Sequence, residues 1–172
     1  GAADLGIAAG ASTSLLSIVR LIFWVVMVAD IGVNQSLIGT DLGDGGAAAF
    51  ATGLLKGLEN NSSPSLRVLS LSHNKIGDIG CQALAAAFSQ CPSLAALYMQ
   101  DNVIGDAGIA AIARYCQHVQ LIHVWNNTNV TDACAASLSE LVLIPNLKVL
   151  HMGMCSGRCC SVCMCLMLRC AV

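Results

Sequence analysis

The sequence has little charge and few aromatic side chains. Only 10% of its 172 residues are charged and 4% are aromatic, whereas 56% are hydrophobic. Typical soluble domains carry roughly 25% charged residues. The net charge is −2 and no stretch concentrates lysine and arginine, although proteins that bind nucleic acid rely on such clusters. The composition therefore argues against a nucleic-acid partner, and the length suits one domain with a sizeable core.

Sequence motifs of catalysis are also missing. The chain contains neither H-E-x-x-H nor G-x-S-x-G, and the glycine-rich stretch 39–46 lacks the Lys-Ser/Thr pair of a phosphate-binding loop. His73, His123 and His151 fall on predicted strands that carry almost no carboxylates, so no acid–base pair is evident. We therefore expect no enzymatic activity of its own, no cofactor and no metal ion.

The chain instead contains an internal repeat. The segments "LRVLSLSHNKIGDIG" from Leu66 and "LAALYMQDNVIGDAG" from Leu94 fit one template, L-x-x-L-x-L/M-x-x-N-x-I-G-D-x-G, and start 28 residues apart. A third copy begins at Val119, and a fourth strand begins at Leu147. Residues 42–65 repeat the second half of the unit. The sequence therefore predicts three to four repeats over residues 42–155.

Each unit predicts a short strand, a turn and a helix. Alternating apolar residues indicate a strand with one buried face. An asparagine then stands at the turn, where its amide can satisfy buried backbone groups of neighbouring repeats. We expect helix N-caps at Asp78, Asp106 and Asp132. Helical periodicity predicts four inward-facing residues behind these caps: Leu84, Phe88, Ile112 and Leu138.

The repeat resembles the leucine-rich repeat family, in its ribonuclease-inhibitor-like subtype, which also includes the arrays of NOD-like receptors and the activating protein of the Ran GTPase. The resemblance rests on Leu66, Leu69, Leu71, Asn74, Ile76, Gly80, Leu84, Leu94, Leu97, Met99, Asn102, Ile104, Gly108 and Ile112. It implies an α/β solenoid with parallel strands on a concave side and helices on a convex side. It also implies a structural asparagine ladder of Asn74, Asn102 and Asn127, with Cys155 standing in at the last rung.

The strands predict an interaction surface. If Leu69 and Leu71 point inward, the period of two places Val68, Ser70 and Ser72 on the concave face. Stacking then aligns equivalent positions of successive repeats. The candidate partner-binding residues are Ser70, Ser72, His73, Tyr98, Gln100, Asp101, His123, Trp125 and His151. Exposed aromatic residues of this kind are typical anchors of protein interfaces, although ordinary exposed residues are the alternative.

Three functions stay open at this point. The first is a protein-interaction module that binds a macromolecular partner on the concave face. The second is a membrane-anchored, receptor-like or NOD-like-receptor fragment, in which apolar residues 8–29, although interrupted by Arg20, enter the lipid. The third is a regulatory scaffold resembling a small-GTPase activator, which no matched functional residue supports.

The two ends depart from the repeat. Residues 1–41 form an apolar segment that predicts a cap of the array, a membrane segment, or sequence that is not natural coding sequence. Residues 156–172 are rich in cysteine, and Cys160 and Cys163 have the spacing of half a zinc site, to which His151 could add a ligand. Crowding of the cysteines favours an apolar lid, an acylated tail or a degraded end instead. The chain can equally be a fragment of a longer array.

The cysteines and the asparagines give opposite indications of the cellular compartment. Free buried thiols at Cys81, Cys116 and Cys134 would suit a reducing cytoplasm. Five N-x-Ser/Thr triplets would suit secretion, but a chain rich in Asn and Ser produces such triplets easily. We expect a cytoplasmic protein, with membrane association as the alternative.

Overall fold

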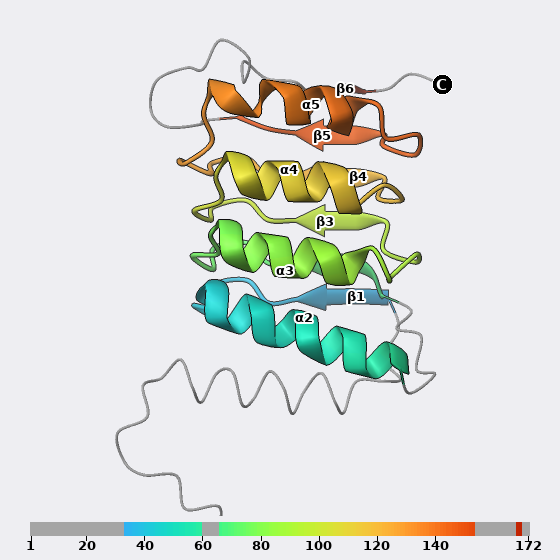
Figure 1. Ribbon diagram of the computed structural model, residues 1–172. Helices are drawn as coiled ribbons and strands as arrows, with labels where there is room; N and C mark the ends of the chain where they lie inside the picture. The colour runs from blue at the N-terminus through green and yellow to red at the C-terminus, as the bar shows by residue number, and fades with distance from the viewer. Residues whose placement is uncertain (1–32, 60–65, 154–167, 170–172) are drawn as a thin grey trace, which may run out of the picture.

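A computed structural model describes residues 33–59, 66–153 and 168–169 of the chain. Strands and helices alternate along these residues (Figure 1). The strands are β1 (Val33–Ser36), β2 (Leu66–Ser70), β3 (Ala96–Tyr98), β4 (Leu121–His123), β5 (Val149–His151) and β6 (Leu168–Arg169). The helices are α2 (Gly43–Glu59), α3 (Asp78–Phe88), α4 (Asp106–Tyr115), the 3₁₀ turn η1 (Asp132–Cys134) and α5 (Ala135–Val142).

The strands form one sheet in the order in which they occur in the sequence, β1 to β6. Strands β1 to β5 are parallel to their neighbours, whereas β6 pairs with β5 in the antiparallel direction. Figure 1 shows helices α2 to α5 stacked in a second layer on one side of the strands. Each unit thus contacts mainly its neighbours, as in a solenoid. This arrangement confirms the predicted α/β solenoid.

The described array begins earlier than the repeat pattern suggested. The sequence placed the start of the repeats at residue 42, whereas β1 at Val33–Ser36 already pairs with β2. At the other end, β6 adds two residues of the cysteine-rich tail to the sheet. The apolar stretch 8–29 and Cys160 and Cys163 lie outside the described residues. Within residues that the structure does describe, no helix is long and apolar enough to cross a bilayer.

The core lies between the two layers and consists of repeated rows. Leu69, Leu97, Ile122 and Leu150, one from each of β2 to β5, are fully buried. The second row, two residues further along the chain in each repeat, is buried as well: Leu71, Met99, Val124 and Met152. The helices contribute Leu84, Phe88, Ile112 and Leu138 from the other layer, as the helical periodicity predicted. Because one face of each of β2 to β5 is buried in this way, the register of these strands is strongly specified.

The aspartates of the G-D-x-G phrase do not cap their own helices, which corrects the sequence prediction. Helices α3 and α4 begin at Asp78 and Asp106, and the N-cap residues are Gly77 and Gly105. The 3₁₀ turn likewise begins at Asp132, behind an N-cap at Thr131. The prediction failed because local spacing cannot show that a carboxylate points toward a different repeat.

The carboxylates of Asp44, Asp78 and Asp106 each accept hydrogen bonds from the helix start of the following repeat. Asp78 Oδ1 accepts from the backbone N–H groups of Gly105 at 2.7 Å and Gly108 at 2.8 Å. Asp44 Oδ1 does the same for Gly77 and Gly80, at 2.7 and 2.9 Å. A carboxylate at this place satisfies unpaired N–H groups and complements the helix dipole. The G-D-x-G phrase is therefore a connection between repeats.

Candidate functional site

The side of the sheet that faces away from the helices, which we call the strand face, is built from residues that alternate with the buried rows. Strand register pairs Ser70 with Tyr98, Tyr98 with His123, and His123 with His151. All four side chains are half-buried. The structure thus places four of the sequence-predicted site residues side by side, across strands β2 to β5.

Four rings on this face contact one another, and we call Tyr98, His123, Trp125 and His151 the ring cluster. The centroids of Tyr98 and His123 lie 5.0 Å apart, and those of His123 and His151 lie 4.8 Å apart, both in edge-to-face geometry. The rings of Trp125 and His151 are nearly parallel, at 19°, with centroids 6.2 Å apart. Such contacts favour preferred relative orientations of aromatic side chains. The ring cluster is therefore a continuous surface of rings that contact one another in turn.

The ring cluster is electrically neutral at its centre near pH 7. Partial burial, followed by the charge of His151, lowers the pKa of His123 below its ordinary value of 6.5. Burial disfavours the charged imidazolium, and a second imidazole nearby disfavours it further. His123 consequently presents an uncharged imidazole, with one N–H donor and one acceptor nitrogen.

A row of apolar side chains lies beside the ring cluster, toward the starts of the strands. Register aligns Val68 with Ala96, Leu121 and Val149, and each is half-buried. We call these four residues the apolar row. The sequence analysis assigned only Val68 to this face. Ala96, Leu121 and Val149 could have been found by counting two residues back from Tyr98, His123 and His151, since alternation fixes the face.

Ser72 does not belong to the accessible surface. Its residue is 1% exposed, and its hydroxyl lies 3.2 Å from the hydroxyl of Ser70. Ser72 thus lies beside Ser70 on the outward side but is covered, so the expectation that it is accessible to a partner is wrong. The equivalent positions Gln100 and Trp125 remain half-buried, so neighbouring side chains rather than alternation decide this difference.

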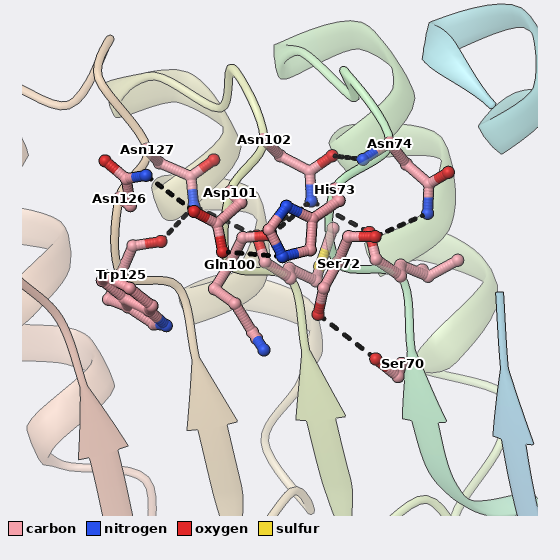
Figure 2. A network of polar contacts seen from close by, with 12 residues as sticks. Ser70, Ser72, His73, Asn74, Gln100, Asp101, Asn102, Trp125, Asn126 and Asn127 are labelled. Carbon is pink, nitrogen blue, oxygen red and sulfur yellow. Dashed lines mark hydrogen bonds and ion pairs between the residues drawn. The ribbon is translucent and has the colours of Figure 1, made fainter. Parts of the chain in front are cut away.

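A polar row follows at the strand ends and consists of His73, Asp101 and Asn126 (Figure 2). Asp101 lies between the other two: His73 Nε2 is 3.3 Å from Asp101 Oδ2, and Asn126 Nδ2 donates to Asp101 Oδ1 at 2.6 Å. All three residues have positive φ, at 58°, 57° and 53°. Asn, Asp and His tolerate this conformation better than most residues. The row combines two predicted site residues, His73 and Asp101, with Asn126, which the sequence analysis did not assign to the site.

The predicted asparagine ladder holds the turns of neighbouring repeats together through backbone hydrogen bonds. Asn102 Oδ1 accepts from the backbone N–H groups of Asn74 at 3.1 Å and Ile76 at 3.0 Å, while its Nδ2 donates to the carbonyls of Leu71 and Met99 (Figure 2). Asn127 is arranged similarly. These amides satisfy backbone groups that the turns would otherwise bury unpaired. Cys155 lies outside the described residues.

Three free cysteines are buried in the core and chemically quiet. Burial raises the pKa of Cys116 to about 12 and raises the pKa values of Cys81 and Cys91 as well. Because the thiolate is the reactive form, thiols with raised pKa values are poor nucleophiles and poor metal ligands at neutral pH.

Within strands β2 to β5, charged side chains lie at the two ends of the strands and not on the strand face. Positions 68, 96, 121 and 149, then 70, 98, 123 and 151, and then 72, 100, 125 and 153 contain no Asp, Glu, Lys or Arg. Arg67 and Lys148 are exposed at the strand starts, whereas Asp101 lies at the strand ends with its side chain 16% exposed. The face is thus an uncharged strip with cationic groups at one end and a carboxylate at the other.

Comparison with known proteins supports the repeat. A family model described as "Leucine Rich repeat" matches residues 62–85 and 90–113. Among solved structures, the tropomodulin C-terminal domain of Caenorhabditis elegans is similar at 13% identity and a TM-score of 0.59, over 76% of this chain and 79% of that chain. No curated protein matches. At this identity the structural likeness shows the fold alone. Neither comparison tests the ribonuclease-inhibitor-like subtype, which stays a prediction.

Proposed function

We propose that this chain, a leucine-rich-repeat protein, is an interaction module that binds a protein partner through its strand face. Leucine-rich repeats generally mediate protein–protein interactions, and the fold alone does not choose the surface. The observation that carries the proposal is the ring cluster, in which four rings from three neighbouring repeats contact one another in turn.

The make-up of the strand face supports this choice. Interface centres are depleted in charge and enriched in Tyr and Trp, with polar groups at the rim. Here Tyr98 and Trp125 lie with the apolar row on an uncharged strip, and Arg67, Lys148 and Asp101 lie around it. The rings already contact one another, so less side-chain entropy is lost on binding.

We further propose that the module works without catalysis of its own, in a reducing compartment such as the cytoplasm. Cys81, Cys91 and Cys116 have raised pKa values and stay protonated, which suits a core function better than a nucleophilic one. Thiols that remain reduced are usual in the cytoplasm.

The experiment is affinity purification from cells with the full chain, followed by quantitative mass spectrometry. Tyr98→Ala and Trp125→Ala are compared with wild type, and Tyr115→Ala is the matched control because Tyr115 is an exposed aromatic residue on α4. Truncating an interface anchor commonly costs about 2 kcal/mol or more. We therefore expect proteins specific to wild type to fall about thirtyfold in both strand-face variants and to persist in the control.

Circular dichroism melting curves establish that the variants are folded. The proposal fails if folded Tyr98→Ala and Trp125→Ala retain every wild-type partner, or if Tyr115→Ala loses the same partners as they do.

A further inference from the structure

We infer that the ring cluster receives a cationic side chain, arginine or lysine, from the bound partner. This inference rests on the proposed function and specifies the chemistry of the group that docks at its centre. Aromatic faces carry a negative quadrupole and attract cations within about 6 Å of the ring centroid, with Trp the best of them.

The geometry of the rings suits a planar guanidinium. Trp125 and His151 stack on each other with planes 19° apart and centroids 6.2 Å apart, and a guanidinium can extend such a stack on an outer ring face. Tyr98 and His123 continue the ring surface across β3 and β4. Arg114 shows the same chemistry within this chain, because its guanidinium carbon lies 5.6 Å from the centroid of the Tyr115 ring.

The charges around the cluster favour a cation over an anion. The strand-face positions of β2 to β5 carry no Lys or Arg that would repel an incoming cation, and Arg169 of β6 pairs with Val149, at the opposite ends of the strands from Asp101. Asp101, whose N–H donates to the Trp125 carbonyl at 3.2 Å, brings a carboxylate to the strand ends next to Trp125. Asn126 and His73 contact that carboxylate. The cations Arg67 and Lys148 lie at the opposite ends of the strands, where they suit acidic residues of the partner.

The titratable groups around the cluster make this docking sensitive to pH. Tyr98, His123 and His151 belong to the face itself, His73 and Asp101 lie at the strand ends, and Arg67 and Lys148 lie at the strand starts. Protonation of His123 at lower pH places positive charge where the partner's cation docks, beside the stacked rings of Trp125 and His151. A cationic group should therefore bind less tightly as the pH falls from 7.5 to 5.5, whereas an anionic group should bind more tightly.

The first experiment identifies the preferred chemistry without a known partner. A random dodecapeptide library is selected on the full chain at pH 7.5, after depletion on Trp125→Ala protein. Enrichment of Arg or Lys at one shared position supports the inference. Enrichment of apolar or acidic peptides without a shared cation overturns the inference but leaves the proposed function standing. Recovery of no peptide that distinguishes the two proteins counts against both.

The second experiment measures the charge directly on a selected peptide. Its shared arginine is replaced by citrulline, which is nearly isosteric and neutral, and both peptides are titrated by calorimetry at pH 7.5 and 5.5. We expect citrulline to weaken binding about three- to thirtyfold, and we expect the arginine peptide to lose affinity at pH 5.5. Tyr115→Ala protein should behave as wild type. Equal affinities for the two peptides, or tighter binding at pH 5.5, would overturn the inference.

Discussion

Two groups of positions in the same repeat behave in opposite ways. The turn position at 74, 102 and 127 is asparagine each time, and all three amides are buried and bonded to the neighbouring repeat. Two residues earlier, Ser72, Gln100 and Trp125 share no chemistry. The first group satisfies backbone groups that recur in every turn, so its residue type recurs. The second group faces outward, where no backbone requirement limits it, and there the repeats can differ to suit a partner.

The largest loss of stability is expected from a substitution in the asparagine ladder. Asn102→Ala removes the acceptor for two backbone N–H groups and the donor to three backbone carbonyls. Each unpaired buried group costs roughly 1–3 kcal/mol, so we expect unfolding free energy to drop by about 3 kcal/mol or more in urea titrations. Asn126→Ala, in the half-buried neighbouring row, removes one side-chain hydrogen bond and should cost far less. Similar losses for the two variants would remove the distinction between the two groups.

A second test concerns the close approach of repeats. A Cβ at Gly108 would lie 2.5 Å from Ile104 Cγ2 and 2.8 Å from Asp78 Oδ1. We expect Gly108→Ala to destabilise the protein by about 1–3 kcal/mol, as overpacking does. Gly57→Ala is the matched control, because nothing lies within 4 Å of its Cβ and alanine is the better helix former. The interpretation fails if thermal melting shows both variants equally stable or Gly108→Ala the more stable.

The aspartate connection predicts a smaller loss at a distant location. Asp78→Ala should cost about 1 kcal/mol, as loss of a helix cap does, and the damage should appear in α4 and not in α3. Hydrogen exchange should accelerate at the amides of Gly105 and Gly108, which donate to Asp78. Asp132→Ala, which changes an exposed aspartate, serves as control. Faster exchange confined to α3 would show that Asp78 caps its own helix after all.

The smallest effect concerns pH. The pKa of His123 is below 6.5 in the folded protein, so the unfolded chain binds a proton more readily and stability declines as the pH falls below 6.5. His118, whose pKa burial also lowers, acts in the same direction. His123→Gln should therefore flatten part of the decline in unfolding free energy between pH 7.5 and 5.5. If the pH dependence of the unfolding free energy is unchanged in this variant, His123 does not contribute to the decline.

Much of the fold could be predicted from the residues because the repeat is regular. Alternation assigned Leu69 and Leu97 to the core, and the shared template aligned Tyr98 with His123 without any coordinates. Strand β1 was missed because its sequence, VNQS, lacks the apolar alternation of the other strands. Strand β6 was missed because pairing at the edge of a sheet depends on which segment lies nearby, and a two-residue strand leaves no pattern.

The sequence by itself determined the solenoid, the asparagine ladder and the alignment of the strand-face rows, because all three follow from periods of two and of about 28 residues. The tertiary structure alone decided that Asp78 caps the following repeat, that Ser72 is covered while Trp125 is half-buried, and that four rings are in contact. These outcomes depend on the separation and orientation of side chains in different repeats. Such distances are set by packing, and no spacing within one repeat encodes them.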